Sequence, residues 1–244
     1  MNRKNAGAVF GTLCGLTALT AMSAEIFYNF SINTKSPIHM SKLNNLVQKV
    51  TNTSGSEEDA SEKYSGLTGT PEMKKWYNEH GEDVYITSDS LRLHGKIFKN
   101  NSSKYVIVCH GYTSKAKHMA GFVNKFYSLG YNVLAADARA HGDSEGTKIG
   151  MGWPERFDVI KWIKLIISWE PNAQIILHGV SMGAATVLMA SGEELPENVK
   201  VIIADCGYTS EWDEFKCEAN ALHIPWFPVL NAASVMSRLR DGYD

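Results

Sequence analysis

From about residue 84 onward, short runs of β-branched and aromatic residues alternate with segments whose apolar residues recur at helical spacing. The run at residues 105–109 is continuous and apolar, and the runs at residues 132–136 and 174–177 are apolar after a first polar residue. Such runs are typical of strands that are buried on both faces of a parallel sheet. The intervening helical segments are predicted at residues 119–130, 154–169 and 183–191. This alternation predicts an α/β fold with a mainly parallel sheet and flanking helices.

Three further strands are predicted at the two ends of this pattern. Residues 84–87 and 91–98 have strand composition, and Ser88-Asp89-Ser90 between them predicts a hairpin. Another apolar strand is predicted at residues 199–204. Ligands and reactive groups in α/β sheets gather at the carboxyl ends of the strands, so the segments that follow the strands are the first place to look for a functional site.

Charge and cysteine content exclude several functional classes. The 244-residue chain has 24 Lys and Arg against 26 Asp and Glu, a net charge of −2. No overall positive field is available to hold a nucleic-acid backbone, so no nucleic-acid partner is expected. The four cysteines form no C-x-x-C pair, which argues against a zinc ribbon or a dithiol redox site. Neither a metal nor an organic cofactor is expected.

The first 30 residues predict a targeting segment. Arg3 and Lys4 precede residues 6–24, which contain no charged residue. As a helix rising ~1.5 Å per residue, this stretch would span roughly 28 Å, close to the thickness of a bilayer's hydrocarbon core. We therefore expect residues 1–30 to form a signal anchor, a single transmembrane helix. A signal peptide cleaved after the small residues at 21–24 and a buried helix of a soluble protein are the alternatives.

The basic residues at the start favour a cytoplasmic N-terminus, so the rest of the chain is expected on the outer side of the cell membrane. Cleavage of a signal peptide would instead make the protein secreted. Residues 31–70 are rich in Ser, Thr, Asn and acidic residues and have few large apolar side chains. They predict a flexible spacer. Residues 71–244 are then expected to form the globular domain.

The most informative motif is Gly179-Val180-Ser181-Met182-Gly183, which follows the predicted strand at residues 174–177. Alone, G-x-S-x-G is a weak signal, and it is also found in turns without any chemistry. Here a buried strand precedes it and a helix of small residues follows, which is the setting of a nucleophile elbow. The glycines are expected to be necessary because side chains there would collide with the strand and helix around the turn.

Two other strand ends carry polar residues. His110-Gly111-Tyr112 follows the strand at residues 105–109, and its Tyr112 amide could join the Met182 amide as a pair of oxyanion donors. The run from Asp137 to Gly146 follows the next strand. We expect Asp137 and Arg139 to brace this loop, and His141 either to line the substrate cleft or to be solvated. His110 and Gly111 are expected to support the same cleft.

In this order, the His-Gly-Tyr segment, the Asp-x-Arg-x-His-Gly-x-Ser-x-Gly run and G-x-S-x-G resemble the α/β-hydrolase fold. More closely, the chain resembles bacterial serine-aminopeptidase-like hydrolases with an N-terminal membrane segment, from about Trp76 to its end. The resemblance implies that Ser181 is the nucleophile and that the amides of Tyr112 and Met182 form the oxyanion hole.

The resemblance also implies a general base and an acid that orients it, in the chain order Ser, then Asp or Glu, then His. Each would follow a later strand, but only helices and a Pro-containing loop are predicted after residue 210. We therefore expect a sheet that is incomplete at its C-terminal edge, in a chain truncated at its C-terminus. Asp205 and His223 keep the required order, although no strand between them returns the histidine to the sheet. His141 is a less favourable substitute for the base.

Together these observations predict a serine hydrolase that acts on an ester, amide or peptide bond of a small substrate. The first alternative is a catalytically inactive remnant, a pseudoenzyme that binds ligands. In a third interpretation, a second polypeptide supplies the last strands, because residues 199–204 would otherwise be an exposed apolar edge prone to aggregation.

Overall fold

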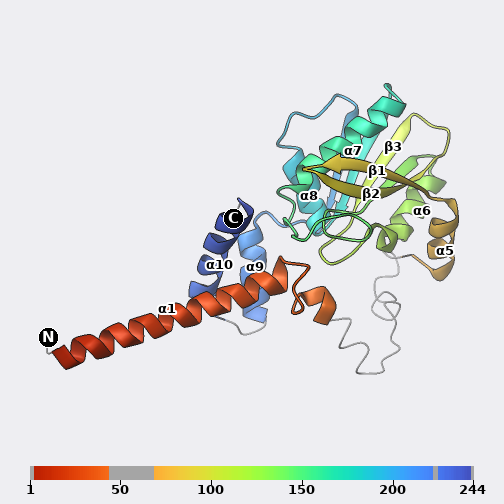
Figure 1. Cartoon of the computed structure of the whole chain (residues 1–244). Coiled ribbons are helices and arrows are strands. Elements are labelled where there is room, and N and C mark those ends of the chain that lie inside the picture. The colour runs from red at the N-terminus through yellow and green to blue at the C-terminus, as the bar shows by residue number, and fades with distance from the viewer. Residues whose placement is uncertain (1–2, 44–68, 222–224, 243–244) are drawn as a thin grey trace. The chain divides into compact units, whose positions relative to one another are not determined.

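The computed structural model describes residues 3–43, 69–221 and 225–242, and the chain divides into two compact units (Figure 1). The helical unit comprises residues 1–43 and 210–244, and the sheet unit comprises residues 44–209. The sequence predicts one domain over residues 71–244, whereas the structure groups residues 210–244 with the N-terminal helix. Of the predicted spacer, residues 44–68 lie outside the described residues.

Among the described residues, six strands form the sheet, in the order β1-β2-β4-β3-β5-β6. The strands are β1 (Glu82–Ser88), β2 (Leu91–Phe98), β3 (Lys104–Cys109), β4 (Asn132–Ala136), β5 (Gln174–Val180) and β6 (Val199–Asp205). β1 and β2 pair antiparallel, as do β2 and β4, whereas β4, β3, β5 and β6 run parallel. The predicted mainly parallel α/β fold is therefore confirmed.

The hairpin between β1 and β2 closes through a two-residue loop. Ser88 pairs with Leu91, and Asp89 and Ser90 between them have φ angles of 49° and 66°. Positive φ at both loop residues is characteristic of the tight turns whose twist matches that of the flanking strands. The predicted hairpin at residues 88–90 is thus confirmed.

The strand register brings several loops to one edge of the sheet. Cys109 at the end of β3 pairs with Ala136 of β4 on one side and with Gly179 of β5 on the other. Gly179 in turn pairs with Ala204 of β6. Because these parallel strands end at the same level, the segments that follow them leave the sheet side by side, as expected for an α/β site.

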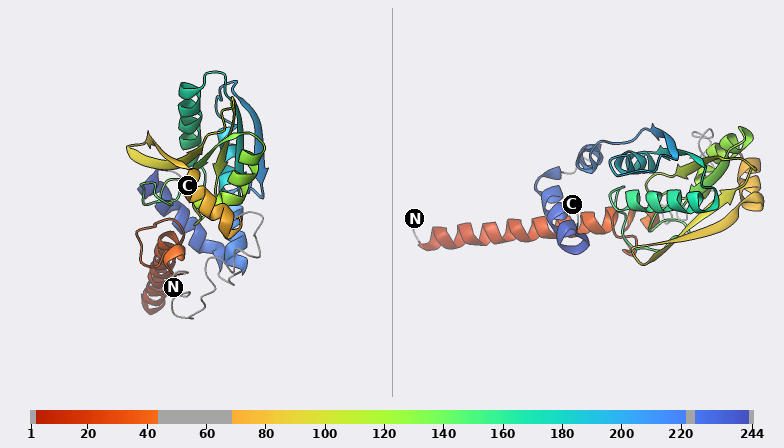
Figure 2. Two further views of the ribbon diagram at one scale, coloured as in Figure 1. Left: turned by 90° about the vertical axis from the view of Figure 1, so that its right-hand side faces the viewer. Right: turned by 90° about the horizontal axis from the view of Figure 1, so that it is seen from above.

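Helices cover both faces of the sheet (Figure 2). They are α5 (Pro71–His80), the 3-10 helix η1 (Ala116–Met119), α6 (Ala120–Ser128), α7 (Glu155–Trp169) and α8 (Met182–Ala190). On one face, Ile107 of β3 packs in a core cluster with Trp162 of α7 and Val187 of α8. On the other face, Val108 packs in a cluster with Val123 of α6. The alternation of side chains along β3 therefore supplies two separate core layers.

The edge strand β6 is less protected than the strands inside the sheet. Val201 and Ile203 are 46% and 37% exposed, whereas Ile175 and Leu177 of the neighbouring β5 are fully buried. Within the described part of the chain, β6 pairs with β5 alone. The predicted exposure of this apolar strand is confirmed.

The helical unit is built from α1 (Arg3–Ser31), α9 (Glu211–Ala221) and α10 (Trp226–Asp241). Ion pairs and aromatic contacts join them. Arg240 donates to both carboxylate oxygens of Glu25, at 3.0 and 2.8 Å, and the Tyr28 hydroxyl donates to Asp241 at 2.9 Å. Phe27 meets Phe215 edge to face, with ring centroids 5.1 Å apart. Residues near the two ends of the chain thus form one packed unit.

The predicted transmembrane segment, residues 6–24, belongs to α1. Across the stretches that the structure describes, no helix combines the length and apolar character needed to cross a membrane, so the predicted anchor finds no support.

Candidate active site

Ser181 occupies a strained turn between β5 and α8. It is the residue that precedes the first turn of α8, and its backbone has φ 53° and ψ −117°, a region that non-glycine residues rarely adopt. Its amide donates to the carbonyl of Asp205 at 2.9 Å, which ties the turn to the end of β6. The chain therefore reverses sharply at the serine, as in a nucleophile elbow.

The two glycines of the motif are required by close backbone packing. A Cβ on Gly179 would lie 2.1 Å from the carbonyl oxygen of Gly183, and a Cβ on Gly183 would lie 2.2 Å from that of Cys109. Both oxygens belong to backbone and cannot move away without displacing a strand or helix. The expected collision of side chains at these positions is therefore confirmed, and the turn depends on Gly at both.

The segment after β3 lies against the serine. A Cβ on Gly111 would be 3.4 Å from Ser181 Cβ and 3.9 Å from its Oγ, so the His-Gly-Tyr segment passes beside the side chain of Ser181. Tyr112 follows directly. Met182 is the first residue of α8, and amides at that position have no acceptor within the helix. The predicted oxyanion donors thus belong to the two segments that flank Ser181.

Two buried histidines connect the loops around this turn. His110 Nδ1 donates to Gly111 O at 2.8 Å, and its Nε2 accepts from the Ala138 amide at 3.0 Å. His141 Nδ1 donates to Arg139 O at 2.9 Å, and its Nε2 accepts from the Thr113 amide at 3.2 Å. Each ring is therefore neutral in these contacts. Burial also lowers the pKa of His110. His141 is buried, not solvated.

Asp137 is a buried centre of the loop after β4. Its carboxylate accepts from the Ala116 amide and from His94 Nδ1, each at 2.7 Å, and from the Asp143 amide at 3.2 Å. Although burial alone would raise the pKa of this carboxyl, these donors hold it below its usual value. A Cβ on Gly142 would lie 2.3 Å from the carboxylate, so only glycine fits there. Asp137 thus links its own loop to β2 and to η1.

Arg139 fixes the same loop to α7 and to the hairpin. Its Nε and one terminal nitrogen donate to the two carboxylate oxygens of Asp158, at 2.8 and 2.7 Å. The same terminal nitrogen also donates to Asp89 at 2.9 Å. Arg139 and Asp158 are both buried. A two-pronged contact of this kind holds a guanidinium in a single orientation.

Sequence reasoning missed His94 and Glu155. His94 in β2 donates to Asp137 and, through Nε2, to Asp83 at 3.0 Å, so both ring nitrogens carry protons, and the Asp137 hydrogen bond raises its pKa. Glu155, fully buried at the start of α7, accepts from the amides of Gly150 and Gly152. The sequence offers one signal for His94 and Glu155: each is a polar residue at a position that otherwise faces the core.

One group of side chains has the composition of a metal site: His94, Asp137 and Asp143 offer ligand atoms within 4.8 Å of one another. Both ring nitrogens of His94, however, donate protons to carboxylates, which leaves neither lone pair for a metal. The existing hydrogen bonds therefore account for this group without a metal.

The predicted acid and base are not brought to Ser181 in the described residues. Asp205 lies at the exposed end of β6, and it contacts the serine turn through its backbone carbonyl. His223 lies outside the described residues. His141 uses both ring nitrogens on backbone groups, so it is not placed as a substitute base. Across the described ranges, no histidine hydrogen-bonds to Ser181 Oγ.

The fold and this strained serine turn define an α/β hydrolase. The Pyrococcus furiosus esterase Pf2001 has a similar structure, with a TM-score of 0.53 and 29% identity over 66% of this chain and 64% of that one. Residues 100–239 match the model of the family described as serine aminopeptidase, S33, and the chain belongs to this family.

Two curated relatives are similar to more than half of this chain. The uncharacterized protein YqkD of Bacillus subtilis (strain 168) is 32% identical over 140 residues, which cover 57% of this chain and 46% of that protein. The lysophosphatidylserine lipase ABHD12 of Bos taurus is 27% identical over 156 residues, 63% of this chain and 37% of the lipase. The chain therefore spans less than half the length of these two relatives. The family to which the chain belongs is a family of hydrolases.

Proposed function

We propose that this protein hydrolyses an ester or amide bond of a small-molecule substrate through an acyl-enzyme formed on Ser181. The observation that carries the proposal is the Ser181 backbone, held at φ 53° and ψ −117° between β5 and α8. A conformation of this kind costs about 1–3 kcal/mol and persists only when its surroundings enforce it. The glycine contacts and the hydrogen bond to Asp205 supply that enforcement.

In the proposed reaction, Ser181 Oγ attacks the carbonyl carbon of the substrate, and the carbonyl oxygen becomes an oxyanion. The backbone amides of Tyr112 and Met182 donate hydrogen bonds to this oxyanion. The bond to the leaving alcohol or amine then breaks, and that group leaves with a proton. Water cleaves the acyl-serine and releases a carboxylic acid. Asp205 and His223 remain the candidates for the acid and the base.

An ester is the substrate class to test first. The solved relative Pf2001 is named an esterase, and the bovine relative is named a lysophosphatidylserine lipase. Both names describe cleavage of carboxylic esters. An amide or peptide remains within the same acyl-transfer chemistry, because the attack on the carbonyl carbon and the oxyanion are shared.

A non-catalytic binding module is the second candidate. One observation favours it. Within the described residues, no histidine is hydrogen-bonded to Ser181, and both ring nitrogens of His110 and of His141 are hydrogen-bonded to backbone groups. A serine without a general base keeps only a fraction of the catalytic power of a triad.

Labelling with a fluorophosphonate probe separates the two candidates, because the probe reacts with an activated serine. We expect the full chain to be labelled and Ser181→Ala to lose the label. Ser191→Ala is a matched control, since Ser191 is an exposed serine at the C-terminal end of α8. Absence of labelling in the folded unmodified chain, together with no turnover of p-nitrophenyl acetate, would overturn the hydrolase and leave the binding module.

A further inference from the structure

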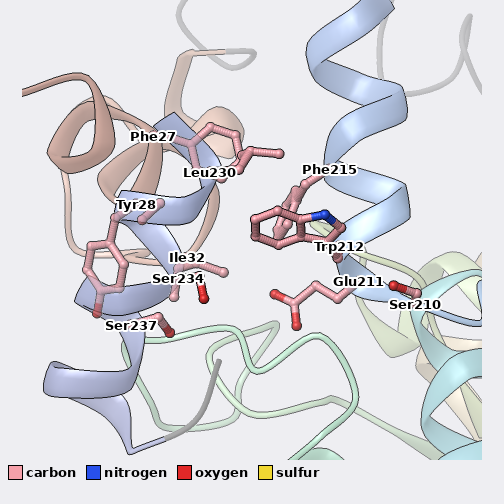
Figure 3. A pocket seen from close by; sticks show the side chains of 11 residues that line it. Phe27, Tyr28, Ile32, Ser210, Glu211, Trp212, Phe215, Leu230, Ser234 and Ser237 are labelled. Atoms are coloured by element: carbon pink, nitrogen blue, oxygen red, sulfur yellow. The ribbon is translucent and has the colours of Figure 1, made fainter. Parts of the chain in front are cut away.

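The helical unit contains a cavity of about 390 Å³ between α1, α9 and α10 (Figure 3). This volume is at the lower end of the roughly 300–1,000 Å³ typical of small-molecule sites. Phe27 packs edge to face on Phe215, so part of the wall is fixed before any ligand binds. The apolar side chains of the lining come from all three helices: Phe27 and Tyr28 from α1, Trp212 and Phe215 from α9, and Leu230 and Ala233 from α10.

The polar residues of the lining lie on one side of the cavity. Among the described residues these are Ser210, Glu211, Ser234 and Ser237. Figure 3 shows them in the lower part of the view, with Phe27 and Leu230 in the upper part. A ligand that fits both sides therefore has an apolar body and a polar group at one end.

The hydroxyl of Ser234 can bind that polar group. Ser234 lines the open space opposite Glu211 (Figure 3), and no described residue hydrogen-bonds to its Oγ. By contrast, Ser210 Oγ accepts from the Asp213 amide at 3.3 Å, and Ser237 Oγ donates to Asp241 at 3.3 Å. A hydroxyl has one hydrogen to donate and two lone pairs to accept with, so Ser234 suits an uncharged oxygen group.

A charged ligand would find no partner ready in this cavity. Among the described residues that line it, none is a lysine, arginine or histidine, so a carboxylate would lose its water without gaining a cation. A cation would meet Glu211, which already interacts within the protein. Arg240 lies over the ring of Tyr28. Lys216 lies over the ring of Trp212, so a ligand cation would find a protein cation at both rings.

We propose that this cavity binds a small uncharged amphiphile, a single alkyl chain with a hydroxyl or carbonyl oxygen at one end. The chain lies against Phe27, Phe215 and Leu230, where burial of apolar surface drives binding. The oxygen hydrogen-bonds to Ser234 Oγ. The proposal does not depend on Ser181, so it stands or falls separately from the hydrolase activity.

The test compares three probes that share one alkyl chain and differ in charge: octan-1-ol, octanoate and octyltrimethylammonium. Binding to the full chain is measured by isothermal titration calorimetry, below the concentrations at which the probes form micelles. We expect octan-1-ol to bind most tightly. Each charged probe should bind at least about tenfold more weakly, because its charge is desolvated without gaining a partner.

Ser234→Ala should weaken binding of octan-1-ol roughly fivefold through the lost hydrogen bond. Ser23→Ala is the matched control, because it removes the same hydroxyl from a half-buried position of α1 that does not line the cavity. Ser234→Phe should fill the cavity and abolish binding of octan-1-ol. Because Ser234→Ala removes a single atom, the test holds even if Ser234→Phe does not fold.

Three results would each overturn the proposal. The first is the absence of saturable binding of octan-1-ol to the folded chain. The second is a charged probe that binds as tightly as octan-1-ol or more tightly. The third is an equal effect of Ser234→Ala and Ser23→Ala on binding of octan-1-ol.

Discussion

His110 and His141 lie edge to face, with ring centroids 5.0 Å apart, and together they connect the loops that follow β3 and β4. His110 accepts from the amide of Ala138, whereas His141 accepts from the amide of Thr113. Each histidine thus belongs to one loop and holds the backbone of the other. The position of the Tyr112 amide, between Gly111 and Thr113, is therefore set from both sides.

Replacing His141 should disturb this arrangement. In His141→Ala, the Thr113 amide loses its acceptor, and the free energy of unfolding should fall by about 1–2 kcal/mol. We expect fluorophosphonate labelling of Ser181 in the folded variant to slow by about tenfold, as for a misplaced oxyanion donor. His141→Gln, which retains an acceptor and a donor, should recover part of the rate. Unchanged labelling in folded His141→Ala would contradict this positioning role.

The glycines on either side of Ser181, Gly179 and Gly183, should tolerate no side chain. Gly183→Ala brings a Cβ to 2.2 Å from a backbone oxygen, and we expect a loss of about 3 kcal/mol or more in unfolding free energy, or no soluble protein. Gly130→Ala is the comparison, because no atom lies within 4 Å and the cost arises from its φ of 85° alone. It should cost about 1–2 kcal/mol. Equal losses, measured by urea unfolding, would argue against the collision.

Stability should depend on pH through His94 and Asp137. The pKa of His94 is raised in the folded state, so its contribution is complete below about 6.5, the unfolded value, and is lost as pH rises through the folded value. The pKa of Asp137 is lowered, so its contribution is present above about 3.9 and is lost as pH falls through the folded value.

The His94 contribution can be isolated by substitution. His94→Gln should cost roughly 2–3 kcal/mol at about pH 6 and less at about pH 9, because the charged hydrogen bonds of the unmodified protein are lost as pH rises through the raised folded-state pKa of His94. Urea unfolding at the two pH values measures the difference. His80→Gln is a suitable control, because His80 is exposed at the end of α5. The same cost at both pH values would contradict the assignment of a protonated His94.

The two arginine ion pairs should differ in strength. Arg139→Lys leaves the buried Asp158 without its two-pronged partner, and a loss of about 3–5 kcal/mol is expected. Arg240→Lys alters an exposed pair with Glu25, whose loss should cost less than about 1 kcal/mol. Thermal unfolding of both variants measures the contrast. Similar losses would show that burial does not decide the strength of these pairs.

Local patterns in the sequence were sufficient for the parts of the site that lie on one segment. The Ser181 turn follows from a buried strand, a glycine on each side and a helix of small residues, all within about 17 positions. The contact between His94 and Asp137 could not be predicted in this way, because it depends on the pairing of β2 with β4. Which residues of two distant strands lie opposite each other is decided only in the assembled sheet, so a local sequence pattern does not give it.

The sequence pattern also did not predict that residues 210–244 form one unit with the N-terminal helix. Helical spacing in α9 and α10 predicts that one face of each is buried, but it does not identify the partner. The structure supplies α1 as that partner, through pairs such as Tyr28 with Asp241. His141 illustrates the same limit, since a loop histidine has no local signal that distinguishes burial from solvation.

The hydrogen bond from the Ser181 amide to the Asp205 carbonyl links the Ser181 turn to the edge strand β6. Edge strands open more readily than central strands, because fewer backbone hydrogen bonds must break. Fraying at the end of β6 would therefore release the serine before the core of the sheet loosened. Amide hydrogen exchange at Ser181 should follow the exchange of β6, so a partner that pairs with this edge strand would also stabilise the Ser181 turn.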